Sequence, residues 1–179
     1  MEKIITLTID GIEVKAPEGT TILDAARKIG IDIPTLCFLK DINEVGDCRM
    51  CVVEVEGRRG FATSCIQKVE EGMVVHTNTK NVLDARHIVL DLILSNHPKD
   101  CLECIRSGNC ELQELAKKFN MPEIEFPGER TKHPIDDKSP SIVRDFSKCV
   151  LCRRCVATCK KVQGIGAIDC INRGFESCI

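Results

Sequence analysis

The stretch GDCRMCVVEV, residues 46–55, places Cys48 and Cys51 directly before a short run with the β-branched composition of a strand. Gly46 precedes this C-x2-C pair, and glycine lets a backbone bend close to a bound group because it adopts positive φ angles that other residues avoid. Backbone N–H groups in such a bend can hydrogen-bond the inorganic sulfide of an iron–sulfur cluster. The stretch therefore predicts a metal-ligand loop that leads into a strand over 52–55.

The flanking sequence predicts three further strands, at residues 4–9, 12–14 and 73–75. Asp10-Gly11 lies between the first two and is a strong hairpin signal. A helix is expected to begin at Thr21 and to end at Gly30, with Ile22 and Ala26 on its apolar face. A hairpin, one helix and returning strands together predict an α+β fold for residues 1–78.

The cysteine content and the net charge limit the classes of function that this chain could have. The chain has 13 cysteines in 179 residues and a net charge of -2. An odd cysteine count and an N-terminal segment, MEKIITLTID, without the apolar core of an export signal both disfavour disulfides. The charge gives no basic footprint for nucleic acid, and no apolar run of about 18 residues is present. We therefore expect a cytoplasmic protein, bound to neither nucleic acid nor membrane, whose cysteines hold metal.

The first cysteine group has the spacing C-x10-C-x2-C-x13-C and consists of Cys37, Cys48, Cys51 and Cys65. Four thiolates are the ligand set that a [2Fe-2S] cluster requires. The alternative is a zinc ribbon, which pairs two C-x2-C knuckles, whereas this group contains one. The spacing also differs from the plant-type ferredoxin pattern, so the residues favour the cluster without deciding it.

The second group has the spacing H-x3-C-x2-C-x5-C and consists of His97, Cys101, Cys104 and Cys110. It lies between a helix predicted over 81–95 and a shorter one over 111–119. With no fourth cysteine nearby, a [4Fe-4S] cluster here would take His97 as its fourth ligand, and a neutral imidazole raises the reduction potential relative to a thiolate. One histidine and three cysteines also suit structural zinc, and the spacing leaves both possibilities open.

The third group is the run C-x2-C-x2-C-x3-C that bacterial ferredoxins use for [4Fe-4S] clusters, here Cys149, Cys152, Cys155 and Cys159. Two features depart from that pattern, because Lys160 stands where ferredoxins carry proline and no second run follows. In two-cluster ferredoxins the fourth cysteine of a run serves the other cluster. Cys159 is therefore the default fourth ligand, with Cys170 and Cys178 as alternatives.

The order of the three groups resembles the N-terminal region of [FeFe]-hydrogenase catalytic subunits and of the large peripheral subunit of NADH:quinone oxidoreductase. The stretches that carry this resemblance are residues 46–55, 94–101 (LSNHPKDC), 139–145 (SPSIVRD) and 163–168 (QGIGAI). The resemblance covers essentially the whole chain. It implies a β-grasp ferredoxin-like domain for the [2Fe-2S] cluster and a [4Fe-4S] cluster, rather than zinc, at His97.

With this resemblance, the chain is expected to hold one [2Fe-2S] and two [4Fe-4S] clusters in four consecutive segments. These are the β-grasp domain at 1–78, a small helical domain with one His and three Cys ligands at 79–120, an extended linker at 121–144 and a ferredoxin-type half-module at 145–179. Relatives continue into a second ferredoxin run and a catalytic domain. We therefore expect no hydrogen-activating site within these residues.

No nucleotide-binding fingerprint and no nucleophile arrangement is present in the sequence, so no catalytic residues are assigned. The leading hypothesis is a non-catalytic iron–sulfur subunit that relays single electrons between a flavin subunit that handles NAD(P)H and a second redox subunit or a ferredoxin. A hetero-oligomeric oxidoreductase, including an electron-bifurcating one, fits this role. The alternative is an N-terminal fragment or split subunit of an [FeFe]-hydrogenase or a formate dehydrogenase.

Overall fold

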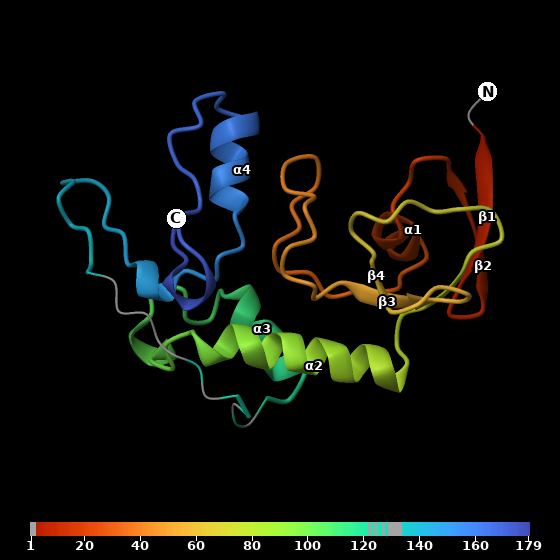
Figure 1. The fold of residues 1–179 in the computed structure, drawn as a ribbon, viewed down its shortest axis with the longest axis horizontal. Coiled ribbons are helices and arrows are strands. Elements are labelled where there is room, and N and C mark those ends of the chain that lie inside the picture. The colour runs from red at the N-terminus through yellow and green to blue at the C-terminus, as the bar shows by residue number, and fades with distance from the viewer. Residues whose placement is uncertain (1–2, 122, 124, 127, 129–133) are drawn as a thin grey trace. The chain divides into compact units, whose positions relative to one another are not determined.

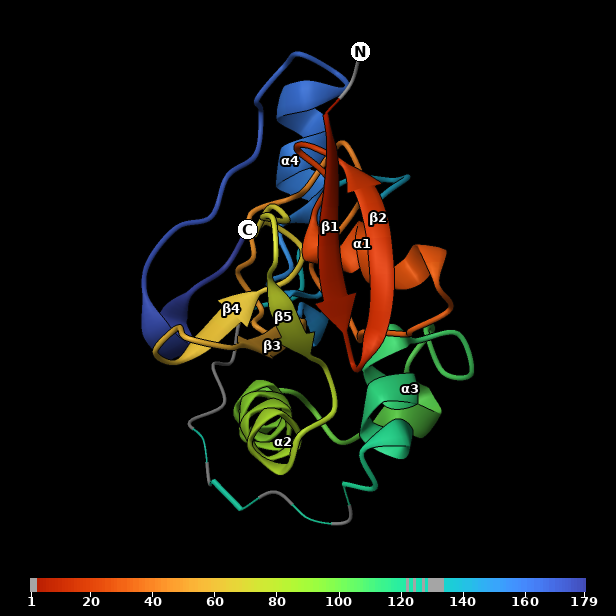
Figure 2. The same ribbon diagram turned by 90° about the vertical axis from the view of Figure 1, so that its right-hand side faces the viewer.

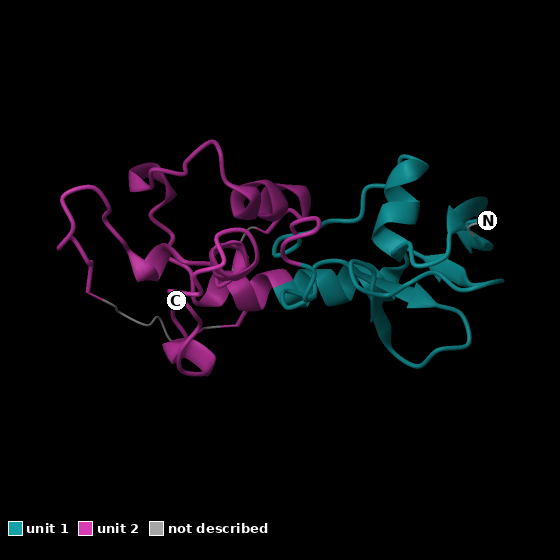
Figure 3. Ribbon diagram, turned by 90° about the horizontal axis from the view of Figure 1, so that it is seen from above, with its two compact units in different colours: residues 1–38, 44–89 teal, residues 39–43, 90–179 magenta. Residues whose placement is uncertain are grey.

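The structure is a computed structural model that describes residues 3–121, 123, 125–126, 128 and 134–179. It contains two compact units, coloured separately in Figure 3. The first comprises Met1–Phe38 and Glu44–Val89, and the second comprises Leu39–Asn43 and Leu90–Ile179. The division falls inside the long helix α2 (Lys80–Ser95), whereas the sequence placed a boundary just before that helix.

In the described residues of the first unit, five strands form one sheet in the order β2-β1-β5-β3-β4. Figure 1 labels β1 to β4, and Figure 2 labels β5 as well. The strands are β1 (Ile4–Ile9), β2 (Ile12–Pro17), β3 (Val52–Val55), β4 (Phe61–Thr63) and β5 (Val74–His76). β1 and β5 pair in parallel, and the other neighbours pair antiparallel. With one helix between the hairpin and the remaining strands, this confirms the expected α+β, ferredoxin-like fold.

The β1–β2 hairpin turns at Asp10 and Gly11, which both have positive φ, at 48° and 83°. Two consecutive positive φ angles are what a tight two-residue hairpin turn requires. The turn sets a register in which Ile9 pairs with Ile12. Leu7 and Val14 then pair with each other and are both buried, so this register places apolar side chains on the core face.

Helix α1 (Ile22–Lys28) lies between the predicted limits, because Thr21 is its N-cap residue and Gly30 follows its C-cap residue, Ile29. The Thr21 hydroxyl oxygen accepts a hydrogen bond from the Asp24 N–H at 3.1 Å, which caps the first turn. At the other end Gly30 has a φ of 81°, and the N–H of Ile31 donates to the carbonyl of Ala26. This left-handed residue followed by a return hydrogen bond is a Schellman ending.

The hydrophobic core lies between α1 and the sheet. Ile22, Leu23 and Ala26 on the helix are fully buried, as is Val53 on β3. Burial of each large aliphatic side chain contributes about 1.5–3 kcal/mol. Because Cys51 and Cys65 belong to the same buried cluster, the packed core fixes the backbone from which two of the first group's thiols project. The core residues are Ile5, Leu7, Ile9, Val14, Ala16, Ile22, Leu23, Ala25, Ala26, Ile33, Phe38, Cys51, Val53, Val55, Cys65, Val69, Met73 and Val75.

The second unit holds short helices joined by irregular segments. Its α-helices beyond α2 are α3 (Glu111–Lys118) and α4 (Arg154–Lys161), with 3-10 turns at Cys101–Glu103, Phe146–Lys148 and Gly174–Glu176. The sequence predicted α2 and α3 to within one residue at each end. It did not predict α4, in which Val156 is the buried residue.

The linker expected at 121–144 lies partly outside the described residues. Within the described part, Asp91 on α2 is 1% exposed and accepts hydrogen bonds from the backbone N–H groups of Glu125 and Phe126. Further along, Asp136 and Arg144 form an antiparallel bridge and an ion pair. None of the helices that the structure describes has both the length and the apolar character needed to cross a bilayer.

Candidate functional site

The four thiols of the first cysteine group come together at the edge of the sheet. The N–H of Cys37 donates to the sulfur of Cys48 at 3.4 Å, and the N–H of Cys48 donates to the sulfur of Cys37 at 3.5 Å. Cys51 directly precedes β3, and Cys65 follows β4 by one residue. Cys37, Cys51 and Cys65 are buried, so the thiols face one another out of contact with water.

The electrostatics of this group show two thiol pairs. A hydrogen bond from the Cys37 thiol lowers the pKa of Cys48 to about 6, and one from the Cys65 thiol lowers the pKa of Cys51 to about 7. Cys37 and Cys65 donate these hydrogen bonds, and their own pKa values are raised by the hydrogen bonds and by burial. Four mutually interacting thiols that include two readily formed thiolates fit the ligand requirement of a [2Fe-2S] cluster.

The loop before β3 has the conformation that the sequence indicated. Gly46 has a φ of 67°, and Arg49, between the two cysteines of the C-x2-C pair, has a φ of 59°. A Cβ atom at position 46 would lie 2.9 Å from Cγ2 of Thr63 and 3.2 Å from Cδ1 of Ile66. Glycine is therefore required here for its dihedral angles and for the close approach of β4.

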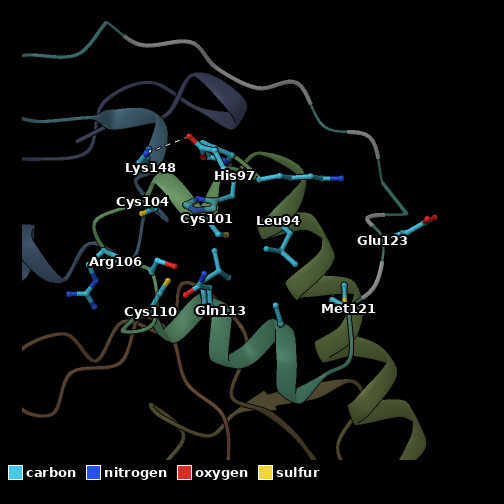
Figure 4. Close-up of a pocket in the computed structure, with 16 residues that line it drawn as sticks. Leu94, His97, Cys101, Cys104, Arg106, Cys110, Gln113, Met121, Glu123 and Lys148 are labelled. Carbon is cyan, nitrogen blue, oxygen red and sulfur yellow. Dashed lines mark ion pairs between the residues drawn. The ribbon is translucent and has the colours of Figure 1, made fainter.

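The second group surrounds a cavity of about 220 Å³ in the second unit (Figure 4). His97, Cys101, Cys104 and Cys110 all line this cavity, together with apolar side chains that include Leu94 and Met121. A water molecule takes up only about 30 Å³ in the liquid. The cavity that these side chains line is therefore large enough to hold a polyatomic group such as a cubane cluster.

Local structure explains how these four side chains reach one cavity. His97 follows the end of α2, and its N–H donates to the carbonyl of Leu94. Cys101 opens a 3-10 turn, and Cys110 is the N-cap residue of α3. The side-chain oxygen of Gln113 accepts from the N–H of Gly108 at 3.1 Å, which closes the loop between Cys104 and Cys110 onto α3.

The third group lies on the loop before α4 and on α4 itself. The N–H of Leu151 donates to the sulfur of Cys149 at 3.4 Å, and Leu151 and Arg153 have positive φ angles of 56° and 58°. Such a loop turns backbone N–H groups toward a bound anionic group. Burial raises the pKa of the Cys149 thiol, and the nearby charges of Cys152, Cys155 and Cys170 raise it further.

The three possible fourth ligands of this group have different surroundings. The sulfur of Cys170 accepts from Nη2 of Arg153 at 3.7 Å, and its charge acts on Cys149 as described above. The sulfur of Cys159 accepts from the N–H of Ala167 at 3.3 Å. Cys178 forms an antiparallel backbone bridge with Ile171.

Several residues around the sites were not indicated by the sequence. Lys148 forms an ion pair with Asp100 at 3.5 Å, and Arg154 forms one with Glu111, so residues next to the third group contact residues next to the second. The Asn43 side chain donates to the carbonyl of Cys152 at 3.0 Å. In the first unit, the buried Arg86 contacts the strand that follows Cys51. These pairs are far apart in sequence and have no motif spacing that could reveal them.

Family models match two parts of the chain. Residues 2–80 match the "2Fe-2S iron-sulfur cluster binding domain", and residues 86–125 match the "NADH-ubiquinone oxidoreductase-G iron-sulfur binding region". These matches contain the first and the second ligand groups. They support iron–sulfur clusters of both types, and they stop before the third group.

Among curated proteins, the chain is 50% identical to NADP-reducing hydrogenase subunit HndD of Solidesulfovibrio fructosivorans, over 98% of this chain and 31% of that protein. It is 40% identical to a subunit of the NADH-quinone oxidoreductase of Streptomyces coelicolor, over 97% of this chain and 21% of that protein. The chain thus spans a third or less of these two relatives. Among solved structures, a chain of NAD+-reducing [NiFe]-hydrogenase in the H2-reduced state superposes with a TM-score of 0.89 and 30% identity, covering 97% of this chain and 73% of that one.

Proposed function

Because this chain belongs to the iron–sulfur family that includes subunits of NADH-quinone oxidoreductases and of NAD(P)-linked hydrogenases, we propose that it relays single electrons between a flavin subunit that oxidises NAD(P)H and a second redox partner. The observation that carries this proposal is the cavity bordered by His97 and three cysteines, in the same unit as a ferredoxin run. Multi-subunit NAD(P)-linked oxidoreductases recur among the relatives, which supports a hetero-oligomer.

The proposed ligand sets follow the three groups. Cys37, Cys48, Cys51 and Cys65 hold a [2Fe-2S] cluster, and His97, Cys101, Cys104 and Cys110 hold a [4Fe-4S] cluster. Cys149, Cys152 and Cys155 hold a second [4Fe-4S] cluster, with Cys159 as the default fourth ligand and Cys170 and Cys178 as the alternatives.

When bound, such clusters supply one-electron redox chemistry with little change in geometry. The protein's own residues then set the relative reduction potentials of the sites. His97 is neutral where the other ligands are anionic, so it makes its site easier to reduce than an all-thiolate site. Burial of Cys37, Cys51 and Cys65 excludes water from the first site, and the N–H groups directed at sulfur stabilise negative charge there.

The proposed relay operates in the cytoplasm, with the flavin subunit on one side and a redox subunit or a ferredoxin on the other. An electron-bifurcating assembly fits because clusters with different ligand types give the relay sites of different potential. Co-purification of the chain from its source organism, followed by identification of the bound subunits, tests this arrangement. Recovery of the chain without any flavin or redox subunit would contradict it.

Metal analysis and electron paramagnetic resonance test the cluster content. The anaerobically purified chain should contain about ten irons, two plus four plus four, with a matching amount of acid-labile sulfide. On reduction it should show one [2Fe-2S] and two [4Fe-4S] signals. Zinc without acid-labile sulfide would overturn the proposal, because zinc sites give no such signal. About six irons would retain the relay but remove the third cluster.

A second candidate is favoured by the 50% identity to a hydrogenase subunit of which the chain covers 31%. In this reading the chain is the front part of an [FeFe]-hydrogenase or a formate dehydrogenase, or a subunit split from one. The genomic sequence that follows the codon for Ile179 distinguishes the two. A hydrogenase catalytic domain encoded in frame would favour the second candidate, whereas a separate flavin-subunit gene would favour the relay.

A further inference from the structure

Arg86 is a buried cation close to the first cysteine group. It lies on α2, its side chain belongs to the first unit, and only 4% of the residue is exposed. Its Nη2 donates to the carbonyl oxygen of Val52 at 2.7 Å, and Val52 directly follows Cys51. Among the residues that the structure describes, its Nε has no hydrogen-bond partner.

No carboxylate in the described part of the chain lies within ion-pair distance of Arg86. Asp10, the carboxylate whose charge acts most strongly on Arg86, is bound to Thr77, whose N–H donates to Oδ1 of Asp10 at 2.7 Å and whose hydroxyl donates to Oδ2. Burial lowers the pKa of Arg86 to about 10, and the negative charges of Cys51, Asp10 and Asp32 act in the opposite direction, with Cys51 the strongest of them. Arg86 remains a cation at neutral pH.

A buried guanidinium without a carboxylate is costly, because the charge loses its hydration without gaining a partner. Such a cost is offset when an anionic group is bound nearby. The first cysteine group would become one on binding a cluster, since four thiolates and two sulfides outweigh the charge of two irons. A cluster bound at the first cysteine group would therefore offset the cost of burying the Arg86 charge, since Arg86 contacts the residue that follows Cys51.

We propose that Arg86 raises the reduction potential of the [2Fe-2S] cluster at Cys37, Cys48, Cys51 and Cys65. Reduction adds one electron, delivered in the relay by the flavin donor, and breaks no bond. The added negative charge lies near a fixed positive charge in a region that excludes water, so Arg86 stabilises the reduced form more than the oxidised form. This inference rests on the proposed function, because it requires that cluster.

A purely structural role for Arg86 makes a different prediction. If the side chain only filled space and bound the Val52 carbonyl, its removal would lower stability without changing the potential of the clusters that remain. The midpoint potential of the [2Fe-2S] signal, measured on the full chain by dithionite titration with electron paramagnetic resonance, separates these roles. The two [4Fe-4S] signals in the same sample serve as internal references.

The test compares Arg86→Gln and Arg86→Lys with the control Lys80→Met. Arg86→Gln should shift the midpoint to more negative potential, so that the ratio of reduced to oxidised cluster at the wild-type midpoint falls roughly ten-fold. Arg86→Lys keeps the charge and should retain most of the wild-type potential. Lys80 lies on the same helix with an 87% exposed side chain, and its replacement should leave the potential unchanged because solvent screens it.

A second pair of variants keeps Arg86 in place, in case Arg86→Gln fails to fold. Val82 is fully buried one helical turn before Arg86. Val82→Glu supplies a carboxylate that neutralises Arg86 and should lower the potential, whereas Val82→Gln has the same size without the charge and should not. Equal potentials in the charged and neutral members of either pair would overturn the inference. Absence of a [2Fe-2S] signal in the wild type would instead overturn the proposed function.

Discussion

Arg154 and Glu111 form a bidentate ion pair, in which Nη1 donates to Oε1 at 2.6 Å and Nη2 donates to Oε2 at 2.8 Å. Arg154 lies between Cys152 and Cys155, and Glu111 directly follows Cys110. The pair therefore links the ligand segments of the two proposed [4Fe-4S] sites across 43 positions of sequence. The parallel geometry suits a guanidinium and a carboxylate and allows little freedom to either side chain.

We expect this ion pair to slow the loss of the [4Fe-4S] clusters. The side chains are 27% and 47% exposed, so solvent screening limits the pair to about 1 kcal/mol. Glu111→Gln should therefore increase the rate at which guanidinium chloride bleaches the cluster absorbance by roughly five-fold. A double-mutant cycle with Arg154→Gln isolates the coupling. The same cycle on Lys80 and Asp84, a more exposed pair, should give about 0.5 kcal/mol or less.

Gly46→Ala is expected to disrupt the first site. The new methyl group would lie 2.9 Å from Thr63 in a backbone with positive φ, so it would combine a clash with dihedral strain of about 1 kcal/mol. Gly57→Ala is the matched control, because Gly57 has a φ of 74° with nothing within 4 Å of its Cβ position. Visible circular dichroism should show reduced [2Fe-2S] occupancy only for Gly46→Ala. Equal occupancy in both variants would contradict the close approach of β4.

His97→Cys should convert the second site to four thiolates and lower its reduction potential, by on the order of 100 mV, because an anionic ligand replaces a neutral one. His97→Ala should instead lose the [4Fe-4S] signal or leave a three-iron cluster. His87, on α2 outside the ligand groups, provides the control, and His87→Ala should preserve all signals. A wild-type potential in His97→Cys would show that His97 is not a ligand.

The fourth ligand of the last site can be identified with three serine variants. Cys159→Ser should abolish or strongly perturb the signal of this cluster, whereas Cys170→Ser and Cys178→Ser should retain it. The expectation follows from the ferredoxin spacing and from the N–H of Ala167, which donates to the sulfur of Cys159 at 3.3 Å. Iron content and electron paramagnetic resonance of each variant give the answer. Loss of the cluster in Cys170→Ser or in Cys178→Ser alone would instead identify that cysteine as the fourth ligand.

The sequence predicted the elements whose signals are local. Asp10-Gly11, Thr21 and Gly30 each act through the backbone of their own neighbours; the hairpin turns at the first pair, and α1 lies between the other two. Strand β4 was missed because it has only three residues, which are too few to show an alternation of apolar and polar side chains. Helix α4 was missed because the cysteine spacing replaces the apolar periodicity that would otherwise reveal a helix.

The candidate sites show the same difference between signals that are local in sequence and contacts that are not. Cysteine and histidine spacing predicted the candidate ligand residues, because clusters impose such spacing on a chain. The sequence did not indicate the residues that contact the ligand segments, because their partners are distant in sequence. Arg86 looks like an ordinary polar residue of an amphipathic helix, and only the fold shows that it is buried beside Val52. The contact between Asn43 and the carbonyl of Cys152 spans 109 positions and likewise has no sequence signal.

Strand β5 lies between β1 and β3 in the sheet, although it is the last of these strands to be synthesised. Before Val74–His76 leave the ribosome, the hairpin at the N-terminus and the β3–β4 pair cannot be joined into one sheet. Cys51 and Cys65 flank that second pair, so their final positions also await β5. The cellular machinery that assembles iron and sulfide therefore meets a finished first site only after translation has passed the entire ferredoxin-like domain.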